Sequence, residues 1–269
     1  MRKILLGMVG VVALGFAAPA SAADLAARPY TKAPPPMMAA IYDWSGFYVG
    51  LNGGGGWSQK CWDRTSTLGV VLTPAVAEGC HDASGGVAGG QVGYRWQAGS
   101  WVFGLEAQGD WANLTGSNTS LIVIPGGVNC IAACPAAVNT GDRSKIDGFG
   151  LFTGQVGYAW NSVLLYVKGG GAVVADRYTG FVPLTGVIVD SVNETRWGGA
   201  VGTGLEFSFA PNWSVALEYD HLFMGTRSLN FNSIITPGLI TRQDNIRQDV
   251  DLATVRVNYR WGGPVVAKY

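Results

Sequence analysis

Charged side chains are scarce in this sequence. Asp, Glu, Lys and Arg together make up 13% of the 269 residues, and the formal net charge is zero. Proteins that bind nucleic acid carry a surplus of Lys and Arg gathered on one face. The composition therefore gives no support for a nucleic-acid partner.

Long hydrophobic runs are also missing beyond the N-terminus. Arg2 and Lys3 precede an apolar run at 4–17, and three small residues follow at 20–22, a pattern typical of a secretory signal peptide over residues 1–22. Residues 23–43 are rich in proline and are predicted to form an extended periplasmic lead-in. No later stretch reaches the roughly 20 uninterrupted apolar residues that a membrane helix needs. The chain is expected to be exported, and a helical membrane protein is not expected.

Glycine and aromatic residues are abundant instead. The chain has 40 Gly and 10 each of Trp, Tyr and Phe, with a mean hydropathy of +0.20. Polar and apolar residues alternate with the period of two that a strand requires, most clearly where Val255, Val257 and Tyr259 alternate with Arg256 and Asn258. The alternation predicts eight strands, near residues 44–58, 85–97, 101–116, 145–160, 163–179, 195–210, 213–229 and 247–261.

Tryptophan marks the ends of these segments. The short connections after 97, 160 and 210 are edged by Trp, whereas the alternate connections are polar and about 15–28 residues long, as in barrels whose long loops lie outside the cell. Trp prefers the membrane–water interface. The interface aromatics are expected to be Trp44, Trp96, Trp101, Trp160, Trp213 and Trp261.

A soluble β-sandwich would also show alternating strands, but it would not explain the Trp placement or the long loops at one end only. We therefore predict an all-β fold, an eight-stranded antiparallel up-and-down transmembrane β-barrel over residues 44–261, followed by a C-terminal tail at 262–269. The barrel is expected in the outer membrane of a Gram-negative cell, with extracellular long loops.

The polar face of the strands is expected to fill the lumen, because eight strands make the narrowest such barrel. Its charges are five basic and five acidic, namely Arg95, Lys168, Arg196, Arg256 and Arg260 with Glu106, Asp110, Glu206, Glu218 and Asp220. Glu206 and Glu218 flank the turn at 211–212 and are expected to be cross-strand neighbours that need Arg256 or Arg260 as a cation. These charges form either a structural ion-pair plug or a gated path for small solutes.

All four cysteines fall in two predicted outer loops, Cys61 and Cys80 in the first and Cys130 and Cys134 in the second. Pairing within each loop is the simplest of three possible disulfide connectivities in an oxidising compartment. A metal site formed by Cys61 with Cys80 and His81 is the alternative, although its spacing matches no established motif.

The chain has only two histidines. Asp220 and His221 are adjacent in a predicted strand, so their side chains point to opposite faces and this Asp cannot orient this His for catalysis. We therefore expect no enzyme activity and no cofactor. Haem ligation would have to use His81, His221 or Met224.

Four stretches resemble the alphaproteobacterial outer-membrane surface-antigen family, small porin-like barrels that include immunogenic proteins of Brucella and haemin-binding proteins of Bartonella. They are Tyr42-Asp43-Trp44-Ser45-Gly46-Phe47-Tyr48-Val49-Gly50-Leu51-Asn52-Gly53-Gly54, residues 86–96, residues 218–225 and residues 255–261. The resemblance implies an outer-membrane barrel whose partners are membrane lipid, lipopolysaccharide and the barrel assembly machinery. The chain departs from the usual pattern because eight residues, with Pro264 among them, follow Trp261.

The expected function is structural and surface-presenting, with a possible weak small-solute pore. Haem binding or nutrient capture is the alternative, and a general porin is the third hypothesis. Host or environmental surface ligands are possible partners, because loops carry such functions and their shape is not predictable from one sequence.

Overall fold

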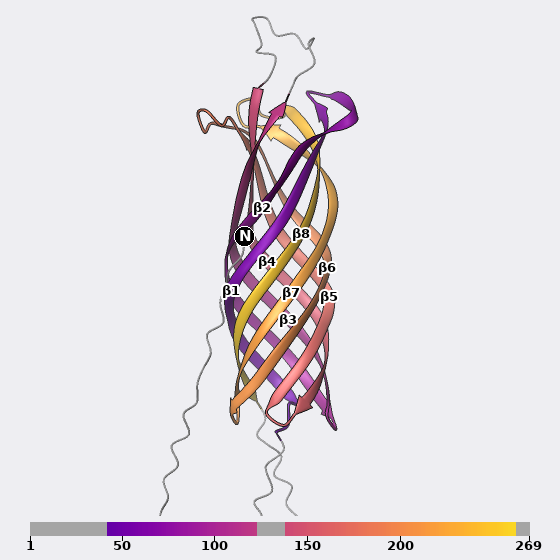
Figure 1. Ribbon diagram of the computed structural model, residues 1–269, viewed down its shortest axis with the longest axis vertical. Coiled ribbons are helices and arrows are strands. Elements are labelled where there is room, and N and C mark those ends of the chain that lie inside the picture. Colours follow the sequence, from indigo (N-terminus) through magenta and orange to yellow (C-terminus); the bar gives the residue numbers. More distant parts are fainter. Residues whose placement is uncertain (1–41, 123–137, 262–269) are drawn as a thin grey trace, which may run out of the picture. The chain divides into compact units, whose positions relative to one another are not determined.

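The computed structural model describes residues 42–122 and 138–261. They form a closed barrel of eight antiparallel strands in which every strand pairs with its neighbours in the chain and the last pairs with the first (Figure 1). The predicted fold class is confirmed. The strands are β1 (Gly46–Thr67), β2 (Val70–Ala98), β3 (Trp101–Ile122), β4 (Val138–Trp160), β5 (Val163–Phe181), β6 (Ile188–Ala210), β7 (Trp213–Ser233) and β8 (Ile240–Trp261). None of the described residues forms a helix long and apolar enough to cross a membrane.

The two ends of the barrel differ from the prediction in different ways. At the end with short turns, the strand boundaries lie within two residues of the predicted ones. At the other end the strands continue well beyond them, so that most of the predicted loop at 59–84 is strand, closed by a turn at Leu68 and Gly69. The prediction missed these extensions because water surrounds a hairpin above the bilayer, so its outer face needs no apolar residues.

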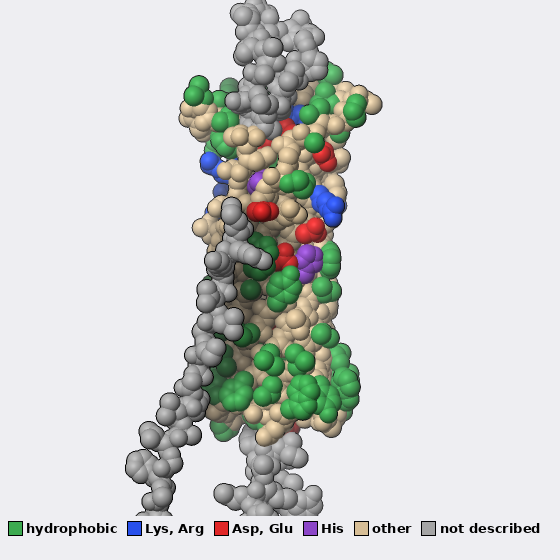
Figure 2. All heavy atoms as spheres, in the orientation of Figure 1, with side chains coloured by type: hydrophobic (Ala, Val, Ile, Leu, Met, Phe, Trp, Pro, Cys, Tyr) green, Lys and Arg blue, Asp and Glu red, His purple; other side chains and the backbone are tan. Residues whose placement is uncertain are grey.

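The outer face of the barrel carries an apolar band. Phe, Leu, Val and Trp side chains gather on the lower part of the surface, and charged side chains appear above them (Figure 2). Along β7 the band runs from Trp213 to Phe223, ten positions later. A strand tilted by about 40° rises roughly 2.5 Å per residue along the barrel axis, so the band is about 25 Å tall, as expected of an outer-membrane barrel.

The aromatic ring at the short-turn end contains five of the six expected tryptophans. Trp96, Trp101, Trp160, Trp213 and Trp261 are 44–56% exposed on the outer face. Trp44 is the exception, because it precedes β1 and is only 1% exposed inside the barrel mouth. Its assignment to the interface was wrong, because Trp44 lies at the inward parity of Tyr48, whereas the outward positions of β1 are Phe47, Val49 and Leu51.

Candidate functional site

The short-turn end of the lumen is closed by the segment that precedes β1. Trp44 packs with Val102, Ala159, Leu164 and Tyr166. Its backbone N–H donates to Gln97 Oε1 at 2.7 Å, and its indole N–H donates to the carbonyl of Asn161 at 3.1 Å. These contacts hold the segment between β2 and the β4–β5 turn.

Above Trp44 the lumen contains a buried layer of ion pairs. Lys168 Nζ lies 2.7 Å from Glu218, 3.1 Å from Asp220 and 3.5 Å from Glu106. Arg256 bridges Glu106, at 2.8 Å, and Glu218. We call this group the lower ion-pair layer, and all seven of its side chains are at most 2% exposed. It contains three cations, Arg95, Lys168 and Arg256, and four carboxylates, Glu106, Glu206, Glu218 and Asp220.

Two tyrosines add hydrogen bonds to this layer. The hydroxyl of Tyr48 donates to Glu106 at 2.6 Å, and that of Tyr166 donates to Glu218 at 2.5 Å. Each ring lies against a glycine of a neighbouring strand, Gly93 or Gly204, where a Cβ would clash with the ring. Absence of a side chain at these positions is what admits two large rings into a narrow barrel.

The lower ion-pair layer differs from the predicted network in its members. Arg196 lies elsewhere, paired with Glu194 at 2.9 Å and donating to the carbonyl of Ile246. Arg260 donates to the carbonyls of Asp43, Ser45 and Pro211 at the closed mouth, and none of the described carboxylates pairs with it. Asp110 accepts a hydrogen bond from Gln108 at 2.8 Å and has no cation partner among the described residues.

Arg256 is the cation partner of Glu218, as expected, but Glu206 and Glu218 are not directly opposite each other. Glu206 faces Ala216 across the β6–β7 pair, and Glu218 faces Gly204. A register shift between Ser208 and Ala210 displaces β6 relative to a symmetric turn. Glu206 consequently pairs with Arg95, at 2.9 Å, rather than with Arg256 or Arg260.

An apolar layer, absent from the prediction, lies above the ion pairs. It is a buried cluster of Ala83, Val87, Leu114, Ile146, Phe149, Leu151, Ala172, Val174, Ala200, Leu222, Met224, Val250 and Leu252. These side chains lie on the inner face of the barrel wall, which carries polar residues in the lower part of the strands. The signal in the sequence is a change of the apolar residues from the outer face to the inner face along most of the strands, although β1 contributes none to this layer.

A third, aromatic layer follows toward the extracellular end, where Trp62, Tyr178 and Phe231 pack together with Ile246. His81 lies beside it, 8% exposed, with its ring 6.0 Å from Trp62 and its Nε2 2.7 Å from Ser144 Oγ. The expectation that His81 is a loop residue was wrong.

The haem-ligand candidates are divided between the two faces of the barrel wall. His81 and Met224 are buried inside, whereas His221 is on the outer face. His221 therefore cannot join either of the others as a second axial ligand.

The extracellular end contains an upper ion cluster, which the sequence prediction also missed. Arg242 lies 2.7 Å from Asp142, 3.2 Å from Asp244 and 3.3 Å from both Glu78 and Asp190. Arg64 pairs with Glu78 and Asp244. This cluster lies above the apolar band, where burial and the neighbouring carboxylates raise the pKa of Glu78 well above its ordinary value.

A pocket of about 230 Å³ opens beside the upper ion cluster. Arg64, Arg242 and Asp190 line it together with Phe181 and Thr241. It offers both signs of charge and one aromatic ring to a solute from outside the cell.

Cys61 and Cys80 form a disulfide between paired positions of β1 and β2, with their Cα atoms 4.1 Å apart. The pairing agrees with the simplest predicted connectivity, but the bond links two strands rather than stapling a loop. Cys130 and Cys134 lie outside the described residues.

His221 has a carboxylate partner, although it is not Asp220. Asp220 is buried in the lumen, while the Nδ1 of His221 lies 2.7 Å from Asp251 of β8 on the outer face. The register places His221 opposite Asp251, and that register is not visible in the alternation of a single strand.

Comparison with known proteins agrees with this architecture. The profile of a family described as outer membrane protein beta-barrel domain matches residues 9–260. The 31 kDa outer-membrane immunogenic protein of Brucella melitensis is 25% identical over 235 residues, which cover 85% of this chain and 90% of the relative. An uncharacterized protein of Coxiella burnetii is 29% identical over 192 residues, 67% of this chain and 71% of the relative.

Two solved structures are similar to the barrel at low sequence identity. The outer membrane protease OmpT from Escherichia coli has a TM-score of 0.47 at 9% identity, covering 80% of this chain and 97% of that one. The outer membrane protein OprG from Pseudomonas aeruginosa has a TM-score of 0.42 at 11% identity, covering 83% and 100%.

The match of the family profile to nearly the whole chain, together with the closed eight-stranded barrel and its apolar band, establishes the family and the location. The chain belongs to the outer membrane protein beta-barrel domain family, resides in the outer membrane, and is similar to the 31 kDa outer-membrane immunogenic proteins of Brucella.

Proposed function

We propose that the protein is a closed barrel that anchors its extracellular hairpins in the outer membrane and presents them at the cell surface. The observation that carries the proposal is the succession of buried layers along the lumen: the Trp44 group, the lower ion-pair layer, the apolar layer, the aromatic layer and the upper ion cluster. Interiors packed in this way contain few voids larger than a water molecule. Such a lumen suits a scaffold better than a conduit.

Conductance in planar bilayers tests the closed state. The refolded full chain is expected to give no steady current above that of the protein-free bilayer, because each packed layer would have to separate before a hydrated ion could pass. A steady, reproducible conductance of porin size would overturn the proposal and favour the general porin.

Epitope insertion tests surface presentation. A short peptide tag placed between Leu68 and Gly69 is expected to bind antibody on intact cells, since this turn closes the β1–β2 hairpin above the apolar band. The same tag between Asn161 and Ser162, in a short turn, is the matched control and should bind only after permeabilisation. Staining of intact cells by the second tag alone would reverse the proposed orientation.

The pocket beside the upper ion cluster favours a second function, capture of a small polar solute at the extracellular mouth. Haem is not a good match for it, because neither His81 nor Met224 lines the pocket. Titration of the refolded protein with haemin is expected to give no Soret shift at micromolar concentration. A saturable shift that His81→Ala abolishes would instead support haem capture.

A further inference from the structure

The apolar band has one polar interruption. Within the described residues, Asp251 is the only carboxylate and His221 the only imidazole that face outward between the aromatic ring and the charged surface above it. Figure 2 shows a histidine beside an acidic side chain at the upper edge of the hydrophobic region. Ionisable side chains at membrane depth are costly and generally mark a function.

The two side chains belong to one hydrogen-bonded group with Tyr219. The Oδ1 of Asp251 accepts from the hydroxyl of Tyr219 at 2.5 Å and lies 2.7 Å from the Nδ1 of His221. The side chains of His221 and Asp251 remain 27% and 21% exposed, and the His221 ring packs edge-on against Phe223 with centroids 4.4 Å apart. We call these three residues the outer polar triad.

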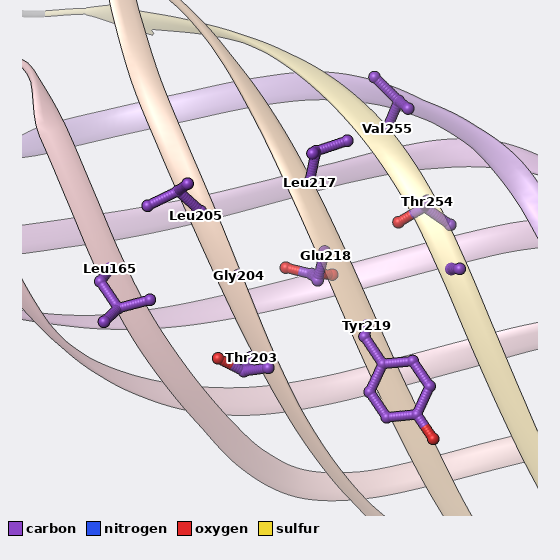
Figure 3. Close-up of a pocket in the computed structure, with 10 residues that line it drawn as sticks. Leu165, Thr203, Gly204, Leu205, Leu217, Glu218, Tyr219, Thr254 and Val255 are labelled. Carbon is purple, nitrogen blue, oxygen red and sulfur yellow. The ribbon is translucent and has the colours of Figure 1, made fainter. Parts of the chain in front are cut away.

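A groove of about 450 Å³ on the outer wall begins at the triad. Figure 3 shows Leu165, Leu205, Leu217 and Val255 around it, with Tyr219 on the same strand as Leu217. Its floor is low because Gly204 has no side chain and Ala253 has only a methyl group. Tyr219 therefore joins two features, since its ring lines the groove and its hydroxyl bonds to Asp251.

The depth of the triad in the membrane determines which part of a lipid molecule can contact it. His221 is eight positions from Trp213, which places it roughly 20 Å above the aromatic ring at about 2.5 Å per residue. The triad thus lies just below the outer interface, and the exposed side chains of Arg247 and Asp249 come next along β8. At this level a lipid of the outer leaflet changes from acyl chain to polar linkage.

We propose that the groove and the outer polar triad bind one lipopolysaccharide-type glycolipid of the outer leaflet. One acyl chain lies in the groove, and the linkage region donates an amide N–H or a hydroxyl to Asp251 while the imidazole of His221 contacts its oxygens. A carboxylate accepts hydrogen bonds and donates none. The ester linkages of a glycerophospholipid offer acceptors only, so they do not satisfy Asp251, whereas amide-linked hydroxyacyl chains do. The inference rests on the outer-membrane location and not on the closed lumen.

Native mass spectrometry of the refolded full chain tests the proposal. A lipid A disaccharide with amide-linked hydroxyacyl chains is the probe, and phosphatidylcholine, which carries no hydrogen-bond donor, is the competitor. The wild-type protein is expected to retain the glycolipid roughly tenfold over the phospholipid, since hydrogen bonds to a charged group carry discrimination of about this size. Asp251→Leu should reduce this preference to about one, and Ala253→Phe, which fills the groove, should reduce retention of both lipids.

Ala88→Phe is the matched control, because Ala88 is an exposed outward residue on β2 that does not line the groove and lies two strands away from β8. It should retain lipid as the wild type does. If Asp251→Leu fails to fold, as judged by heat-modifiable gel migration, Asp251→Asn replaces it and should lower the preference by several-fold. Equal retention of both lipids by the wild type, or an unchanged preference in the folded Asp251 variant, overturns the proposal.

Discussion

At the scale of single residues, Trp44 illustrates how the face on which a side chain lies decides its role. Tryptophans that begin or end strands face the lipid interface, whereas Trp44 lies inside the mouth and bonds to Gln97 and to the carbonyl of Asn161. Its burial gives it the energetics of a core residue, not of an interface anchor.

Trp44→Ala is therefore expected to lower the free energy of unfolding by about 3–5 kcal/mol, the usual effect of emptying a core site of this size. Trp101→Ala, at an outward position of the ring, should cost about 1 kcal/mol. Urea unfolding in lipid vesicles, followed by heat-modifiable gel migration, measures both. Equal losses for the two variants would show that Trp44 acts only as an interface residue.

The residue scale also limits what one sequence can predict. Alternation correctly places Arg95, Glu106, Lys168 and Glu218 on the inner face, because that depends only on a period of two. It does not reveal that Arg95 meets Glu206 or that His221 meets Asp251, since these pairs depend on strand register and on one register shift.

At the scale of the strands, the lower and upper halves have different surroundings. Within the bilayer the outer face must be apolar, so the alternation is strong and the lower strand ends were predicted within two residues. Above the bilayer both faces carry polar residues, and in β1 the inward Lys60 and Arg64 alternate with the outward Asp63. The contrast between the two faces of a strand therefore disappears above the bilayer, and the sequence predicts loops where the structure has strand extensions.

The disulfide between Cys61 and Cys80 is expected to stabilise the upper β1–β2 hairpin. Its loop has a sequence separation of 19, for which chain entropy predicts about 3 kcal/mol. The double variant with Cys61→Ser and Cys80→Ser should be cleaved several-fold faster by protease between 62 and 79, while the lower barrel stays intact. Limited proteolysis in vesicles with mass analysis of the fragments measures this. Cys130→Ser with Cys134→Ser is the control and should leave cleavage in this hairpin unchanged.

The upper ion cluster is expected to make the hairpin ends sensitive to pH. Burial, then Asp142 and Asp244, raise the pKa of Glu78, so the folded state holds its proton more tightly than the unfolded state does. The contribution of Glu78 to stability is therefore present at low pH and is lost as the pH rises from about 4.5 through neutrality.

Amide hydrogen exchange near Glu78 and Arg242, corrected for intrinsic rates, should show more protection at pH 5.5 than at pH 8.5. Glu78→Gln mimics the protonated form and should reduce this difference, whereas the part due to Asp244, whose pKa burial raises to about 6, should remain. Protection that increases with pH would contradict the assignment, because it would mean that the ionised carboxylate is the form favoured by folding.

At the scale of the whole molecule, the lumen is closed several times in succession. The Trp44 group, the lower ion-pair layer and the apolar layer lie at different heights. Tyr166 joins the first two, whereas the apolar layer is a separate cluster of contacts that opening the lower two does not remove. A closed channel built in this way tolerates the loss of any single layer.

Redundant closure gives a specific pattern of conductance. Trp44→Ala alone, the pair Glu206→Gln and Glu218→Gln alone, and the pair Leu222→Ser and Leu252→Ser alone should each leave planar-bilayer current at the wild-type level, because the other packed layers remain in each case. All five substitutions together with Trp62→Ala and Arg242→Ala, which open the aromatic layer and the upper ion cluster, should give a measurable small conductance if the barrel still folds, which far-ultraviolet circular dichroism and gel migration verify. A steady conductance from the Glu206 and Glu218 pair alone would contradict redundant closure, since it would make the ion pairs the sole barrier and the barrel a gated pore.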